Sequence, residues 1–93
     1  MEGADWFGAI QQGQTENVRA LLDRNVDIHM RDQTGKSALM CAAAKGHLEI
    51  IAALLDRNAD IDQQDPNGFT AFIFANGMGQ VPAVKLLLDR GAH

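Results

Sequence analysis

Residues 46–62, GHLEIIAALLDRNADID, contain the tetrapeptide around which the whole chain is organised. Its Leu-Leu-Asp-Arg string, at residues 54–57, also occurs at residues 21–24 and 87–90, and successive copies are 33 residues apart. A fixed period between about 20 and 50 residues is typical of repeat architectures, in which each unit packs only against its neighbours. The period therefore predicts a stack of three equivalent units.

Glycine and asparagine recur at the same period and predict where the helices end. These two residues readily adopt the positive φ that a helix C-terminus commonly requires. The glycines and asparagines form two sets with this period: one set would end the first helix of each unit, and the other would end the second helix. We therefore predict a helix–turn–helix–loop unit that occurs three times in an all-α solenoid. The first set is Gly13, Gly46 and Gly79, and the second set is Asn25, Asn58 and Gly91.

Apolar residues at helical spacing predict the individual helices. The first helix lies within residues 1–13, where Trp6, Phe7 and Ile10 form its apolar face. Pro82 stands near the start of the last helix, a position in which proline is tolerated. The remaining predicted helices are roughly residues 15–24, 38–45, 48–57 and 71–77.

Capping and turn residues predict how these helices are joined. Ser37 and Thr70 are expected N-caps, and Thr15 is a candidate cap for the second helix. The two long loops each contain a tight-turn sequence, at residues 32–35 and 65–68. We expect both loops to project away from the helices.

Composition and charge argue against several classes of function. The chain of 93 residues is 46% hydrophobic and 22% charged, which is ordinary for a globular protein of one domain. Its net charge of −4 argues against a nucleic-acid partner, because phosphate binding requires clustered cations. The eight lysines and arginines are scattered along the sequence instead. We expect no nucleic-acid binding.

The single cysteine and the absence of long apolar runs bear on where the protein resides. Cys41 has no partner for an internal disulfide, which favours a reducing compartment. No apolar run approaches the roughly 20 residues of a membrane span, and residues 1–15 contain no signal sequence. We therefore expect a soluble, cytoplasmic (intracellular) protein with no membrane partner.

No residue pattern in the chain points to catalysis or to a bound cofactor. Cys41 and His47 are six residues apart, so they would point about 120° apart on a helix. Asp60, Asp62 and Asp65 resemble part of a calcium loop but lack its glycine and glutamate. The three histidines share no metal-ligand spacing. We expect no catalytic residue, cofactor or metal, and a thiol enzyme built on Cys41 is the least favoured hypothesis.

The second unit offers Asp32, Gly35, Ser37-Ala38-Leu39-Met40, Ala42-Ala43, Gly46-His47 and Leu54-Leu55. This pattern resembles the ankyrin repeat family, whose unit has about 33 residues and a Thr-Pro-Leu-His-x-Ala signature. The resemblance implies one domain, residues 1–93, with a capping repeat at 1–31 and further repeats at 32–64 and 65–93. It also implies a protein–protein interaction module, and it makes His47 a local hydrogen-bonding group in its own turn.

The sequence departs from the family pattern at several positions. Ala38 and Ala71 stand where the family has proline, and Met40 and Ile73 where it has histidine. These changes remove hydrogen bonds that brace adjacent turns, so we expect lower stability than that of a consensus array. Asn76 occupies an alanine position, and we expect its helix to end one residue early.

The resemblance places a partner-binding surface on the loop tips and on the outward side of the first helices. There, an aromatic residue and a methionine flanked by lysines would suit an acidic–hydrophobic peptide or loop of another protein. Two plainer interpretations stay open: Phe74 packs against a neighbouring loop, and the lysines are merely solvated. The expected protein-binding residues are Gln33, Lys36, Cys41, Lys45, Asn67, Phe69, Phe74 and Met78.

Self-association is the alternative functional hypothesis. Terminal repeats need a polar outer face for solubility, and the last unit does not have one. Phe72, Val84 and Leu87 would be left partly uncovered. Either the natural protein continues past His93, or this face binds a partner. The alternative hypothesis is therefore a homo-oligomer that forms through these three residues.

Overall fold

The computed structural model describes residues 2–92, in which the backbone is helical apart from turns, loops and one isolated bridge between Arg31 and Ser37. The predicted all-α fold is confirmed. Each of the four helices with a predicted range begins at its predicted first residue and ends within one residue of its predicted last residue. In the described residues, the helices are α1 (Glu2–Gln11), α2 (Thr15–Asp23), α3 (Ala38–Lys45), α4 (Leu48–Asp56), α5 (Ala71–Gly77) and α6 (Val81–Asp89).

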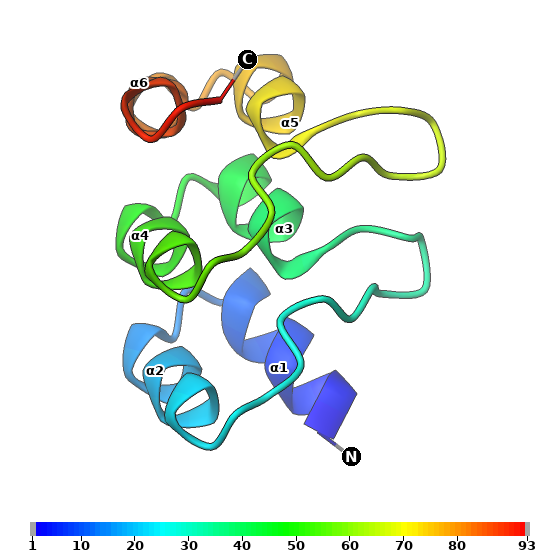
Figure 1. Ribbon diagram of the computed structural model, residues 1–93, viewed down its shortest axis with the longest axis vertical. Helices are drawn as coiled ribbons and strands as arrows, with labels where there is room; N and C mark the ends of the chain where they lie inside the picture. The colour runs from blue at the N-terminus through cyan, green and yellow to red at the C-terminus, as the bar shows by residue number, and fades with distance from the viewer. Residues whose placement is uncertain (1, 93) are drawn as a thin grey trace.

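The helices form three pairs that stack in two layers. Figure 1 shows α1, α3 and α5 above one another in one layer, and α2, α4 and α6 in the layer beside it. Within each layer neighbouring helices pack together: α3 contacts α1 and α5, and α4 contacts α2 and α6. The loops that follow α2 and α4 both project from the side of the first layer (Figure 1). This arrangement is the predicted solenoid.

A continuous apolar core runs along the stack between the two layers. Helix α3, at its centre, has fully buried alanines at Ala38, Ala42 and Ala43, and these small side chains let α1 and α5 approach from both sides. Burial of apolar surface is the main stabilising contribution, at about 25 cal/mol per Å². The largest fully buried side chains are Trp6, Ile10, Val18, Met40, Cys41, Ile50, Ile51, Leu54 and Leu87.

Two of the predicted N-caps are confirmed. Ser37 Oγ accepts a hydrogen bond from the backbone N–H of Met40 at 3.3 Å. Thr70 Oγ1 accepts one from the N–H of Ile73, also at 3.3 Å. Each bond satisfies an N–H group that the first turn of a helix leaves without an intrahelical partner.

The early end of α5 is also confirmed. Helix α3 ends at Lys45, and the equivalent residue of the third pair is Met78, which already lies outside α5. Gly77 is the last helical residue, and glycine is a weak helix former because it loses much conformational freedom.

The prediction that Thr15 caps α2 is wrong. Thr15 is the first residue of the helix, and its hydroxyl donates to the carbonyl oxygen of Gly13 at 3.5 Å. Gln14 occupies the cap position without a side-chain cap bond. His47 and Gln80 occupy the same position before α4 and α6, again without a cap bond. The second helices of the three pairs therefore begin alike.

His47 and Gln80 use their side chains to reach the preceding helix pair. The Nε2 atom of His47 lies 3.3 Å from the carbonyl oxygen of Gln11, and Nε2 of Gln80 donates to that of Ala44 at 3.1 Å. The expectation that His47 bonds within its own turn is therefore wrong. The ring lies over Gly13, where an added Cβ atom would be 2.8 Å from its Cε1 atom.

A second periodic contact joins the helix pairs on the side of α2, α4 and α6. Arg57 donates to the carbonyl oxygen of Leu22 at 2.8 Å and pairs with Asp23. Arg90 repeats the ion pair one period later, with its Nη2 atom 2.7 Å from Asp56 Oδ1. These partly exposed pairs contribute only about 0–1 kcal/mol each, but they align neighbouring pairs in one way.

The projecting loops are ordered by aspartates in their tight turns. Asp32 Oδ1 accepts hydrogen bonds from the backbone N–H groups of Thr34 and Lys36, both at 2.9 Å. Gly35 closes the turn by donating its N–H to the Asp32 carbonyl at 3.0 Å, and Asp65 forms the equivalent turn in the next loop. Burial alone would raise the pKa of Asp32, but these hydrogen bonds and that from the Thr34 hydroxyl lower it overall.

Candidate functional site

A hollow of about 330 Å³ opens where the first loop meets the layer of α1, α3 and α5. Its wall combines lysine ammonium groups with apolar side chains. Gln11 and Ala44, one period apart at the ends of α1 and α3, complete the lining. The lining residues are Gln11, Lys36, Cys41, Ala44, Lys45, Phe74 and Met78.

The structure places most of the predicted binding residues in or beside this hollow. Lys36, Cys41, Lys45, Phe74 and Met78 line it directly. Phe69 does not line the hollow but contacts the ring of Phe74. Gln33 and Asn67 are exposed at the tips of the two turns and are not among the lining residues.

Phe74 is half-buried and held between the two loops. The ammonium nitrogen of Lys36 lies 5.1 Å from the centre of its ring, a cation–π contact worth about 0.5–1 kcal/mol at exposed sites. Phe69 packs edge-to-face against the ring, with the ring centroids 6.0 Å apart and an interplanar angle of 87°. Phe74 therefore does pack against neighbouring loop residues, and its ring remains part of the hollow's wall. Lys36 is accordingly more than a solvated charge.

Met78 and Lys45 form the more accessible part of the site. Met78 is 62% exposed, and Lys45 is exposed at the end of α3. An unbranched thioether side chain adapts readily to different apolar partners. The site therefore combines a fixed ring with an adaptable methionine, next to two positive charges.

Cys41 lines the hollow but is only 2% exposed, so it offers a partner almost no surface. Its thiol donates to Asp32 Oδ2 at 3.7 Å. Burial and the nearby Asp32 carboxylate raise the pKa of the Cys41 thiol to about 12. Because the thiolate is the nucleophilic form, this environment opposes thiol chemistry.

The residues that the structure describes contain neither a metal-ligand cluster nor a membrane-spanning helix. Among their side chains, no three histidine, cysteine, aspartate or glutamate residues lie together as metal ligands would, and His93 lies outside the described range. In the same part of the chain, none of the helices has the length and apolar character required to cross a bilayer.

Comparison with known families identifies the fold. A family model described as ankyrin repeats, in three copies, matches residues 6–93. The chain belongs to the ankyrin repeat family. Ankyrin repeats are in general protein–protein interaction modules and are typically non-catalytic. No individual curated protein matches the chain.

The C-terminal face of the ankyrin stack differs from the prediction in one residue. Phe72 and Val84 are partly exposed there, but Leu87 is fully buried. Leu87 has the position of Leu54, which is also fully buried, so both side chains belong to the core. The adjacent leucine, Leu88, is exposed instead, to 50%.

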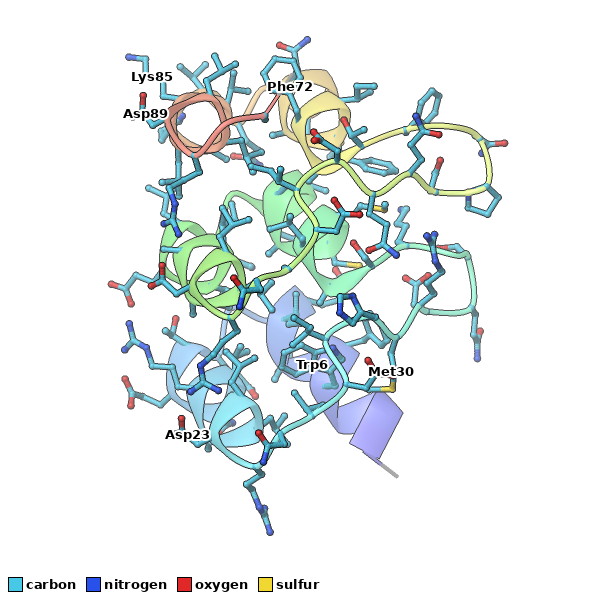
Figure 2. All side chains as sticks on the ribbon, viewed as in Figure 1. Trp6, Asp23, Met30, Phe72, Lys85 and Asp89 are labelled. Atoms are coloured by element: carbon cyan, nitrogen blue, oxygen red, sulfur yellow. The ribbon has the colours of Figure 1, made fainter. Side chains whose placement is uncertain are left out.

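The signal that points to Leu88 was present in the repeated tetrapeptide. Its second leucine is Leu22, Leu55 and Leu88 in the three ankyrin repeats. This leucine becomes more exposed along the stack: Leu22 is 3% exposed beneath the second pair, Leu55 is partly exposed beneath the third, and Leu88 is 50% exposed. Figure 2 shows this face at the top of the stack, with Phe72 on α5 and Lys85 on α6.

Proposed function

We propose that this ankyrin repeat protein binds another protein through the hollow, by accepting an apolar side chain that is flanked by acidic residues. The observation that supports the proposal is the grouping of Phe74 and Met78 with Lys36 and Lys45 around one opening. The protein would act as an adaptor or scaffold and would have no catalytic step of its own.

The geometry of Phe74 favours binding in physical terms. Association costs free energy when mobile side chains must be ordered, by about 0.5–1.5 kcal/mol for each flexible side chain. The ring of Phe74 is already held by Phe69 and Lys36, so little further ordering is required. Aromatic side chains in such settings are frequent sites of large binding energy. The volume of about 330 Å³ is near the lower end for ligand clefts, which suits one or two inserted side chains.

Charge favours an acidic partner segment. The protein has a net charge of −4, yet the lining of the hollow contains two lysines and no aspartate or glutamate. Complementary charge raises association rates and excludes like-charged partners more than it raises affinity. We expect binding to weaken as salt is added, because salt screens charges that are accessible to solvent. Lys36 is partly buried and Lys45 is exposed.

A peptide-display selection would test the proposal. Random peptides are selected on the wild-type chain and on a Phe74→Ala/Met78→Ala variant whose fold is verified by circular dichroism. We expect an apolar residue flanked by aspartate or glutamate to be enriched on the wild type alone. Ile73→Ala/Val81→Ala is a matched control, because it removes two exposed apolar side chains outside the hollow.

The peptide selection can also contradict the proposal. If the double variant and the wild type enrich the same peptides, the hollow is not the binding site. If enriched peptides carry no acidic residues, the proposed role of Lys36 and Lys45 is wrong. Met78→Ala alone is a second variant that leaves the fold intact, since this side chain is mostly exposed.

A buried thiol at Cys41 suits a reducing compartment, which supports a cytoplasmic location.

Self-association is the second candidate function, and the exposure of Leu88 and Ile73 on the C-terminal face favours it. Contiguous apolar residues on a surface mark interaction sites more often than isolated ones do.

A further inference from the structure

Each helix pair presents hydrogen-bond acceptors to the pair that follows it, and these contacts recur with the 33-residue period. One acceptor is the aspartate at the end of the second helix, and its donor is an arginine of the next pair. The other acceptor is a backbone carbonyl near the end of the first helix, and its donor is a side chain that precedes the next second helix. The pairs are Asp23 with Arg57, Asp56 with Arg90, Gln11 with His47, and Ala44 with Gln80.

The same period identifies two further acceptors in the third helix pair and two further donors in the first helix pair. Asp89 follows Asp23 and Asp56 in the acceptor series, and the carbonyl of Gly77 is the next member of the other series. Arg24 and Gln14 are the first members of the two donor series. Arg24 and Asp89 are exposed, and among the described side chains neither belongs to an ion pair. Figure 2 shows Asp23 and Asp89 on the same side of the stack, beside α2 and α6.

One end face carries exposed apolar side chains, and the other contains a hollow. On the C-terminal face, Leu88 is 50% exposed and Ile73 is 44% exposed. At α1 and α2, a hollow of about 480 Å³ is lined by Ala9 and Leu21, together with Gln14, Arg24 and other polar residues. Within the stack, Leu22 has the position of Leu88 and is covered by the following pair.

We propose that a second copy of this chain binds with its first helix pair on the C-terminal face, so that the stack continues head to tail. Leu88 of one copy enters the hollow between α1 and α2 of the next. Arg24 pairs with Asp89 across the junction, and the Gln14 side chain donates to the Gly77 carbonyl. The proposal rests on self-association as the second candidate function, and it specifies the two faces involved.

This contact joins two different surfaces, so it does not close into a symmetric dimer. Heterologous contacts produce rings or open-ended assemblies. Asn17 makes the junction weaker than those within the chain, because it stands where Ile50 and Ala83 are fully buried in the later pairs. A polar side chain placed against apolar residues loses hydration without gaining an equivalent partner. We therefore expect association at high protein concentration, and less of it in high salt.

Two variants, each blocked on one face, test the proposal by sedimentation velocity. Asn17→Glu/Arg24→Glu blocks the first face, and Leu88→Glu blocks the C-terminal face. All three changed side chains are exposed, and the added charges have the same sign, so the blocked faces repel each other. Circular dichroism verifies that each variant is folded.

The mixture of the two variants gives the decisive result. Each variant alone should be monomeric, while the wild type should grow beyond a dimer as its concentration rises. An equimolar mixture should form a one-to-one heterodimer and nothing larger, because each variant retains one working face. Homodimers of the Asn17→Glu/Arg24→Glu variant would instead mean that the C-terminal face pairs with itself. That result would overturn the head-to-tail contact and leave self-association in place.

Two further measurements complete the test. A wild type that stays monomeric at all concentrations and salt levels would overturn both the contact and the second candidate function. Asn17→Ile should tighten association by on the order of tenfold, because an apolar residue then fills the centre of the junction. Unchanged association of this variant would show that the face of α2 is not involved. Phe74→Ala/Met78→Ala should associate like the wild type, because the hollow at α3 and α5 is not part of the junction.

Discussion

Pro66 lies so close to Gly35, in the preceding loop, that a Cβ atom added at residue 35 would be 2.6 Å from its Cδ and Cγ atoms. The two projecting loops are therefore in contact along the stack, and the glycine makes this approach feasible. Gly68 has the equivalent position in the next loop with the same φ of 84°, but an added Cβ atom would meet nothing within 4 Å there.

Alanine substitutions at these two glycines allow the cost of backbone strain to be measured separately from the cost of the steric contact with Pro66. Gly68→Ala should lower the free energy of unfolding by about 1–2 kcal/mol, from the positive φ alone. Gly35→Ala should lower it by about 1–3 kcal/mol more, because the proline ring must move. Thermal or urea unfolding followed by circular dichroism measures both. Equal losses would contradict the contact between the loops.

The ion pair between Arg57 and Asp23 should make only a small contribution to stability. Asp23→Ala should reduce the free energy of unfolding by less than Arg57→Ala does, because Arg57 also donates to the Leu22 carbonyl. A double-mutant cycle should give a coupling energy of about 0.2–1 kcal/mol, as for other exposed pairs. The coupling should decrease in high salt. A coupling that salt leaves unchanged would contradict this account.

Cys41 should make the stability of the protein depend on alkaline pH. The pKa of its thiol is raised from 9.0 to about 12 in the folded protein, so between these values the unfolded chain loses this proton while the folded chain retains it. The contribution is fully present below pH 9 and decreases as the pH rises towards 12. Urea unfolding of the wild type and Cys41→Ala at pH 8 and pH 10 measures the difference, and the variant should lose less stability between the two. Parallel losses would mean that the thiol titrates normally.

Asp32 should contribute stability that is lost in acid. Its pKa is lowered in the folded state, so the contribution is present above the ordinary value of 3.8 and is lost as the pH falls through the folded pKa. Asp32→Asn should reduce the free energy of unfolding at pH 7 by about 1–2 kcal/mol, since a neutral amide oxygen replaces the charged acceptor and an NH2 group replaces the oxygen that accepts from the Cys41 thiol. The difference between the wild type and the variant should shrink as the pH falls below 3.8. A difference that stays constant across this range would contradict the role of the carboxylate.

Much of this fold could be predicted because its information is periodic. The Leu-Leu-Asp-Arg string set the period, and Ser37 and Thr70 marked helix starts one period apart. Such signals are local and are repeated, so each copy supports the others. The grouping of Phe74 with Lys36 was implied by the resemblance to ankyrin repeats, which places both residues on the side of the loops.

The wrong predictions concern side-chain direction, which the period alone does not specify. Leu87 and Leu88 are adjacent on a helix, so about 100° of rotation decides which of them is buried. His47 was expected to bond within its own turn, although its cross-pair contact depends on the space above Gly13. The pairing of Arg57 with Asp23 could have been predicted from the sequence. The repeated tetrapeptide supplies an aspartate in one copy and an arginine 34 residues later in the next copy.

The contacts between helix pairs also constrain how such a molecule changes in length. The side-chain hydrogen bonds that join one pair to the next connect residues 33 to 36 positions apart. A tandem duplication of residues 32–64 would therefore insert a new pair that supplies both its own donors and the acceptors its neighbour needs. An insertion of another length would place donors opposite the wrong residues. Duplication of a whole 33-residue unit would thus lengthen this protein while every donor between helix pairs keeps a matching acceptor.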